Sequence, residues 1–314
     1  MLGFSSKRPP SLARILTIAA EVGVVALGSV VAIATNAWRQ HGLAMLGRLL
    51  HRRASASPAT FDARELDSLP APVARYFRAV LSEGQRIIRA AELSQRGHFL
   101  VRPESAGWRR FYATHHVATS PGGFLWDASI RLAPGISVMV RDAFVDGIGS
   151  MRASVMGVWT LADVEGTPEI AAGALQRYLA EGPWYPTALL PSQGVIWTPL
   201  DDSSACATLT VGATTVSVDF HFAADGTVRR VFTDARSREV EGQFVPTPWQ
   251  GRFSHYAEMH GMKIPRTGEV EWLIDGLPQP YWRGDITAVE FSYDRAAKPE
   301  TERHPASCPA QAAS

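Results

Sequence analysis

An alternation of apolar and polar residues with a period of two, between about Ile87 and Tyr293, constrains the fold of this chain more than any other feature. The segments 124–132, 215–222 and 269–274 each place their large apolar side chains at nearly every second position. Successive side chains of a strand point to opposite faces of a sheet, so each segment predicts a strand with one buried face. Asp-Gly and similar turns separate about ten such segments, which predicts antiparallel hairpins.

A helical pattern interrupts the strands. Thr167 is the expected N-cap, Pro168 suits the first turn, and Gly182 is the expected stop. We therefore predict a mainly β (α+β) fold, a curved antiparallel sheet or half-open β-barrel with this central helix on its concave side. Ten strands closing into a complete barrel is the alternative. Two short helices, 62–69 and 71–81, precede the strands within a β-rich domain of residues 61–295.

The N-terminal region predicts a membrane anchor. Residues 15–35 are almost wholly apolar, and at ~1.5 Å per residue they span the ~30 Å core of a bilayer. A basic segment, 1–14, precedes them, and a juxtamembrane helix and linker, 36–60, follows. A cleaved signal peptide is the alternative, with the small residues 32–34 as its cleavage site. Basic residues flank both ends, so charge gives no orientation; we expect a single-pass protein of the cytoplasmic membrane.

No standard catalytic, phosphate-binding or metal-binding signature occurs in the sequence. With 31 basic against 30 acidic residues, nothing predicts a nucleic-acid partner. We predict no catalytic residue, metal or cofactor. The enzyme alternative draws on several strands, with Asp127, His116 and Glu271 as candidates, although strand neighbours such as His115 and His116 must face opposite sides. Arg177 and Glu181, four residues apart on the helix, are expected to form an exposed pair. Residues 296–314 lack any period and predict a disordered tail.

The segment 177–192 is the most informative candidate for a binding site. Three prolines keep it from becoming regular, yet it is rich in large apolar side chains. We expect those side chains to point into the concavity and to line a pocket for a lipid or another hydrophobic molecule. A fully packed structural or interaction domain is a further alternative. The predicted ligand-binding residues, all large and apolar or aromatic, are Trp126, Tyr178, Trp184, Tyr185, Leu189, Leu190, Trp272 and Trp282.

From about Phe61 to Tyr293 the chain resembles a bacterial family catalogued as a domain of unknown function. The motifs that carry the resemblance are "LPAPVARYF", "GFLWDASIRLAPGISVMVRDAFVDGIG", "EIAAGALQRYLAEGPWYPTALLPS", "TPWQGRF", "GMKIPRTGEVEW" and "PYWRGDI". The resemblance implies no activity, but members often carry an N-terminal membrane segment. The expected architecture is also similar to the half-barrels of bacterial lipoprotein carriers, which implies that the globular domain lies outside the cytoplasm.

Overall fold

Thirteen antiparallel strands form one open sheet in the computed structural model, which describes residues 12–51, 59–100 and 107–293. The strand order is β6-β5-β4-β3-β2-β1-β13-β12-β11-β10-β9-β8-β7, so the first and last strands of the chain's β region meet at the centre of the sheet. β6 and β7 do not pair with each other, which excludes the complete barrel. The predicted tail 296–314 and most of the basic segment 1–14 lie outside the described residues.

Short turns join most neighbouring strands, as the alternation and the glycine positions predict. The structure has more strands than the ten or so expected, because hairpins such as β8–β9 have only two residues between their strands. The strands are β1 (Ile88–Phe99), β2 (Arg109–Thr119), β3 (Gly122–Ala133), β4 (Ile136–Val145), β5 (Ile148–Val155), β6 (Trp159–Glu165), β7 (Ile196–Asp201), β8 (Ser204–Val211), β9 (Thr214–Phe222), β10 (Val228–Val240), β11 (Gln243–Met259), β12 (Met262–Ile274) and β13 (Leu277–Tyr293).

The helices begin where the capping residues predict. The Thr167 hydroxyl accepts a hydrogen bond from the Ile170 N–H at 3.3 Å, and Pro168 occupies the first turn of α3. Prolines also stand in the first turns of η2, η3 and η4, where a missing N–H costs nothing. The helices are α1 (Leu12–His51), η1 (Ala63–Leu66), α2 (Ala71–Val80), α3 (Pro168–Ala180), η2 (Gly182–Trp184), η3 (Pro186–Leu189) and η4 (Pro191–Gln193).

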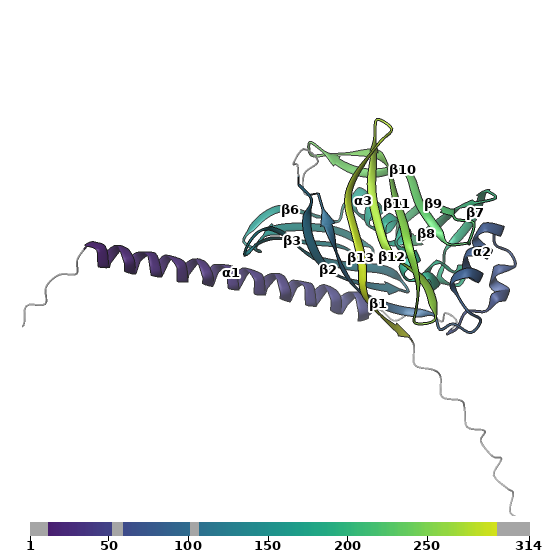
Figure 1. Cartoon of the computed structure of the whole chain (residues 1–314), viewed down its shortest axis with the longest axis horizontal. Coiled ribbons are helices and arrows are strands. Elements are labelled where there is room, and N and C mark those ends of the chain that lie inside the picture. The colour runs from purple at the N-terminus through teal and green to yellow at the C-terminus, as the bar shows by residue number, and fades with distance from the viewer. Residues whose placement is uncertain (1–11, 52–58, 101–106, 294–314) are drawn as a thin grey trace, which may run out of the picture.

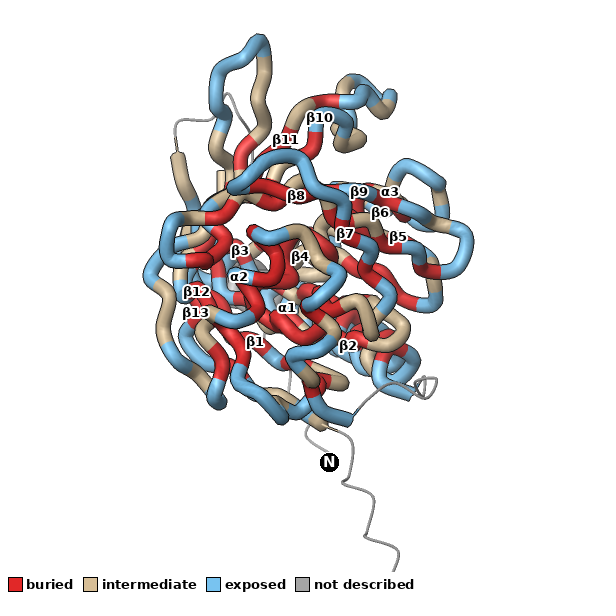
Figure 2. Tube along the Cα trace, turned by 90° about the vertical axis from the view of Figure 1, so that its right-hand side faces the viewer, coloured by how far each residue is buried: buried red, intermediate tan, exposed pale blue. Residues whose placement is uncertain are grey.

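The sheet curves around α3 and the three short turns that follow it (Figure 1). Burial is concentrated between these elements and the inner face of the sheet (Figure 2), where one large apolar cluster extends from α2 to β13. This confirms the predicted central helix on the concave side. The large apolar residues of α3 and its exit replace water in the hollow, which is the main source of stability for such a layer.

α1 lies against the opposite face of the sheet. Its C-terminal half contributes Trp38, Met45 and Leu49 as buried residues at helical spacing. Met45 and Leu49 pack with a second, smaller cluster on β2, β3 and β4, whose other buried members are Ala118, Leu125, Ala143 and Val145. The segment after residue 35 is therefore a helical continuation of α1 that packs on protein.

Candidate functional site

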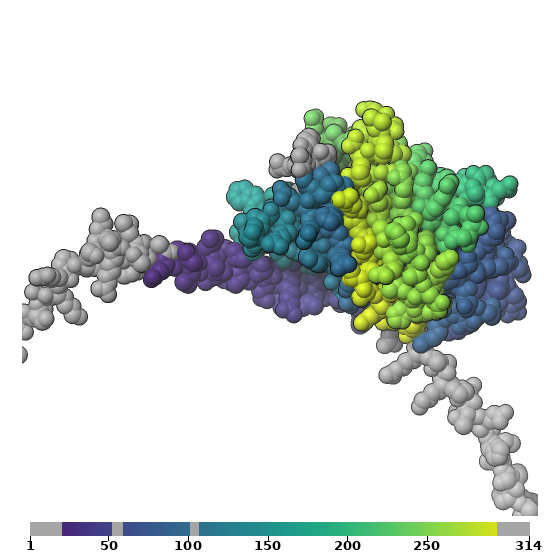
Figure 3. Space-filling view, in the orientation of Figure 1, coloured from purple at the N-terminus to yellow at the C-terminus, as the bar shows by residue number. Residues whose placement is uncertain are grey.

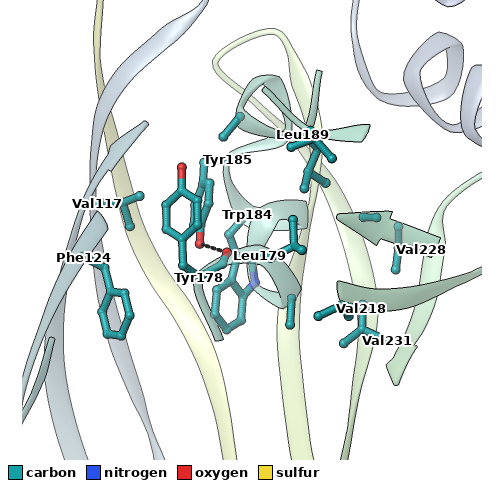
Figure 4. Close-up of a cluster of buried hydrophobic side chains, with 14 of the residues drawn as sticks. Val117, Phe124, Tyr178, Leu179, Trp184, Tyr185, Leu189, Val218, Val228 and Val231 are labelled. Carbon is teal, nitrogen blue, oxygen red and sulfur yellow. Dashed lines mark hydrogen bonds between the residues drawn. The ribbon is translucent and has the colours of Figure 1, made fainter. Parts of the chain in front are cut away.

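The proline-rich exit of α3 fills one part of the concavity. Trp184, Tyr185, Leu189 and Leu190 are all buried in the core cluster. The Tyr185 hydroxyl donates to the Tyr178 carbonyl at 2.6 Å, and the two rings lie 5.6 Å apart (Figure 4). Because these side chains pack on the sheet and on each other, they plug this part of the hollow.

A cavity of about 200 Å³ remains beside the C-terminal end of α3. It lies on the inner face of the sheet, and its walls come from both halves of the strand order. The lining residues are Phe99, Trp126, Val140, Asp142, Met151, Arg177, Glu181, Arg236, Trp249, Val270, Tyr281 and Trp282.

Aromatic side chains form much of the cavity wall. The Trp126 indole N–H donates to Gln95 Oε1 at 2.8 Å, and the Trp249 N–H donates to the Tyr281 hydroxyl at 2.9 Å. These bonds fix the orientation of both indoles. Aromatic rings offer a large apolar contact area at a low entropic cost, so this wall suits an apolar ligand group.

One end of the cavity carries charged side chains that are largely buried. Arg177 bonds to Asp142 Oδ2 at 2.7 Å and to Glu181 Oε1 at 2.8 Å, and its guanidinium lies 4.9 Å from the Trp126 ring centroid. Arg236 donates to the Gly173 carbonyl at 3.1 Å and lies 4.7 Å from the Trp249 ring centroid. The expected exposed pair of Arg177 and Glu181 is therefore wrong, because the concave sheet covers the face of α3 that carries them.

Burial shifts the protonation equilibria of this cluster. Desolvation raises the pKa of Glu181, and the attraction of Arg177 offsets only part of that effect. Desolvation disfavours the charged form of Arg177, but the two carboxylates outweigh it and raise the pKa of the guanidinium. Burial, with a smaller contribution from Arg177, holds the pKa of His115 well below its usual range, so this imidazole is neutral near pH 7.

Several buried polar atoms near the cavity have no hydrogen-bond partner within the described part of the chain. His115 Nδ1 lies 3.5 Å from Glu181 Oε2, without hydrogen-bond geometry. Such atoms are uncommon in protein interiors, because each one costs ~1–3 kcal/mol. Of the residues that carry these atoms, Glu181 and Trp282 line the cavity. These unpartnered atoms are Gln95 Nε2, both ring nitrogens of His115, Glu181 Oε2, Trp184 Nε1 and Trp282 Nε1.

The structure separates the eight predicted binding residues into groups. Trp126 and Trp282 line the cavity. Trp184 lies behind the wall, with its ring centroid 6.2 Å from that of Trp282. Trp272 stacks on Tyr281 at 6.0 Å, and Tyr178 borders a separate hollow beside β2 and β8. The other three, Tyr185, Leu189 and Leu190, belong to the packed plug. Whether any of them binds a ligand stays a prediction.

The residues of the enzyme alternative do not converge. Asp127 pairs with Arg141 beside α1, His116 lies 3.5 Å from Glu92, and Glu271 pairs with Arg252 at 2.8 Å. His115 and His116 do face opposite sides, as strand geometry predicts. In the chain between 12 and 293, apart from the two gaps, no group of three or more His, Cys, Asp or Glu side chains is arranged to hold a metal ion.

Sequence reasoning missed most of the cavity wall. Phe99, Asp142, Arg236 and Tyr281 come from four different strands, and no local motif links them. The only sequence signal was the abundance of tryptophan in strand segments, which includes Trp249. A wall assembled from single residues of many strands has no fixed spacing along the chain.

The fold and the cavity together define the structural class of this protein. An open antiparallel sheet wraps around a helix and encloses a small aromatic cavity with a largely buried ion cluster. The chain belongs to DUF6920, a family of unknown function whose model matches residues 67–291. No curated protein matches the sequence.

Two solved structures are similar in fold. One is a domain named for outer-membrane lipoprotein sorting from Vibrio parahaemolyticus, with 7% identity, a TM-score of 0.34, and coverage of 64% of this chain and 85% of that chain. The other is a DUF1329 family protein from Desulfovibrio piger, with 10% identity, a TM-score of 0.35, and coverage of 77% and 96%. At these scores the likeness carries no argument about function.

Proposed function

We propose that this protein is a membrane-anchored binding protein for a hydrophobic molecule that carries a polar group. The observation that supports it most is the cavity beside α3, which combines an aromatic wall with a largely buried ion cluster of Arg177, Asp142 and Glu181. The apolar part of the ligand contacts Trp126, Trp249 and Trp282. Its polar group meets Arg236 and the cluster around Arg177.

The size of the cavity limits what enters it. At about 200 Å³ it is smaller than the ~300–1,000 Å³ that encloses a whole drug-sized ligand. It therefore takes one ring or a short length of acyl chain, and the rest of a larger molecule stays outside. A lipid held by its polar end and the first part of its chain fits this description.

The anchor in this proposal is α1. Among the described residues, one helix, Glu21–His51, is long and apolar enough to cross a bilayer, a property that a signal sequence near the N-terminus shares. We place the protein in the cytoplasmic membrane as a single-pass protein, with the sheet domain outside the cytoplasm. Activity of a reporter enzyme fused after Tyr293 in one compartment alone tests this orientation.

Lipid extraction and mass spectrometry of the full chain, purified from membranes, test the binding proposal. Val140→Phe places a ring in the cavity from β4, whereas Val245→Phe adds the same bulk at an exposed site on β11 that does not line the cavity. We expect a hydrophobic molecule to copurify with the wild type and with Val245→Phe, and to fall several-fold in Val140→Phe. Val270→Phe fills the cavity from β12 and repeats the test if Val140→Phe does not fold. Equal recovery from all variants, or none above background, contradicts the proposal.

The buried cluster also favours a second candidate, an enzyme that uses acid–base chemistry. Glu181 has a raised pKa, lines the cavity and lies beside the neutral imidazole of His115. Glu181→Gln keeps the shape but removes the proton-transfer group. If the protein is an enzyme, the molecule recovered from Glu181→Gln is a substrate that the wild type has converted. If it only binds, both proteins yield the same molecule.

A further inference from the structure

One hairpin tip touches α1 at the point where its exposed half begins, and a second tip is bonded to the first. A Cβ built at Gly157, in the turn between β5 and β6, lies 3.1 Å from the carbonyl of Ala34. The turn between β3 and β4 is fastened to it, because the Met156 N–H donates to the Ser137 carbonyl at 3.0 Å. Every residue from 21 to 30 of α1 is exposed, whereas burial on the sheet begins with Trp38. In Figure 3 the end of the sheet that carries these tips lies over α1.

The same tips expose large apolar side chains. Trp159 is 71% exposed, and the other members of this group are 45–50% exposed. β6 is also the free edge of the sheet on this side. An apolar side-chain group on a free edge promotes aggregation in water unless something covers it. We call this group the tip patch: Ile136, Val158, Trp159 and Leu161.

The length of α1 indicates what covers the patch. From Ile15, where the apolar segment begins, to Ala34 the helix has 20 residues. At ~1.5 Å per residue this gives ~30 Å, the thickness of the hydrocarbon core of a bilayer. Ala34 and Gly157 thus fall at the level where such a core ends. Tryptophan side chains are enriched at that boundary, and Trp159 is two residues from Gly157 along the chain.

A buried ion cluster holds α1 in a fixed direction relative to the tips. Arg141, which is 2% exposed, donates to the Trp38 carbonyl at 3.0 Å and pairs with Asp127. The Trp38 indole donates to Asp127 Oδ1 at 3.2 Å, and the Arg141 guanidinium lies 4.6 Å from the indole ring centroid. A hinge at this point would break several of these contacts, so α1 and the sheet move as one body.

We propose that the tip patch is a lipid-docking surface, which inserts into the interface of the bilayer that α1 crosses. This inference rests on the anchoring part of the proposed function. The insertion is shallow, because the free backbone N–H and C=O groups of β6 need the hydrated headgroup layer. Val140 of the cavity wall is four residues from Ile136 along β4, or ~13 Å at ~3.3 Å per residue, so docking holds the cavity close to the membrane surface.

Site-directed spin labelling of the full chain tests this surface. The background carries Cys206→Ser and Cys308→Ser, and single cysteines replace Trp159, Val158, Val22 or Leu277. Leu277 is the matched control, because it is apolar, 63% exposed and at the tip of the β12–β13 hairpin, which points away from α1 (Figure 1). Each labelled protein is reconstituted into vesicles of phosphatidylethanolamine and phosphatidylglycerol, and its accessibility to oxygen and to a water-soluble nickel chelate is measured.

We expect the oxygen-to-nickel accessibility ratio at positions 158 and 159 to be several-fold higher than at 277, and lower than at 22 inside the bilayer. Values at 158 and 159 equal to that at 277, with 22 still inside the bilayer, overturn the docking surface and leave the anchor intact. Exclusion of both reagents at 159 also overturns it, and identifies a second copy of the chain as the cover. A water-exposed label at 22 overturns the anchor and the docking surface together. Ligand recovery from the cavity is measured separately, so none of these results decides it.

Discussion

Truncation of Trp184 tests whether the proline-rich exit of α3 is a packed plug. The side chain is 2% exposed, and its ring centroid lies 5.6 Å from that of Phe253 in an edge-to-face arrangement. A Cβ built at Gly268 would lie only 3.0 Å from the indole, so β12 packs tightly against it. Replacing a fully packed tryptophan with alanine costs ~3–5 kcal/mol, because apolar contact is lost and a void remains.

The indole N–H of Trp184 reduces the expected loss of stability, and a second variant, Trp184→Phe, tests this effect. This donor has no partner in the described structure, so its removal relieves ~1–3 kcal/mol of desolvation cost. Trp184→Phe loses only part of the ring and also removes the donor. We therefore expect Trp184→Ala to lower the free energy of unfolding by about 3 kcal/mol, near the low end of the range, and Trp184→Phe to change it by less than ~1 kcal/mol.

Urea unfolding of the full chain in detergent micelles, followed by far-ultraviolet circular dichroism, measures both values. Trp159→Ala is the control, because this exposed tryptophan should change the free energy by no more than ~0.5 kcal/mol in detergent. A loss below ~1 kcal/mol for Trp184→Ala would refute the packed plug. Equal losses for the alanine and phenylalanine variants would instead show that the indole N–H has a partner.

Three further predictions concern α1 and the cavity. Gly42→Val places a side chain 2.5 Å from the Arg141 guanidinium, and we expect proteolysis between α1 and the sheet to become faster as the packing loosens. Burial lowers the pKa of His115, so the contribution of the neutral imidazole to stability is present above pH ~6.5 and is lost as the pH falls. The free energy of unfolding, measured at pH 5 and pH 7.5, should therefore fall less on acidification in His115→Phe than in the wild type. Arg177→Met leaves Glu181 and Asp142 without their cation and should cost ~3–5 kcal/mol at pH 7.5 in the same assay. Because burial raises the pKa of Glu181, its protonation should make the loss smaller at pH 5.

Local sequence rules predicted the parts of the fold that depend on neighbours in the chain. The alternation in 124–132 and 215–222 predicted strands with one buried face, and both lie in β3 and β9. Thr167 and Gly182 predicted the ends of α3 to within two residues. Caps, turns and side-chain alternation act over a few residues, so a single sequence contains all the information they need.

The environment of α3 could not be predicted in the same way. A pair such as Arg177 and Glu181, four residues apart, looks the same on an exposed helix and on one that a sheet encloses. Only the partner from β4, Asp142, distinguishes the two cases, and it is 35 residues away in the sequence. Helical periodicity indicates one buried face, whereas the curved sheet also covers the face of α3 that carries Arg177 and Glu181, which are 14% and 11% exposed.

The cavity and its ion cluster are difficult to explain by stability alone. A buried ion pair is often no more stable than apolar residues of similar volume, and every unpartnered polar atom carries a desolvation cost. A sequence selected only to fill the concavity would replace Arg177, Asp142 and Glu181 with apolar side chains, as it does in the plug at Leu189 and Leu190. α3 and the segment that follows it therefore border two kinds of interior: the apolar, fully packed plug and the polar, incompletely filled cavity. Departures of this kind from good packing are expected at functional sites, which is why we propose ligand binding at the cavity and a stabilising role for the plug.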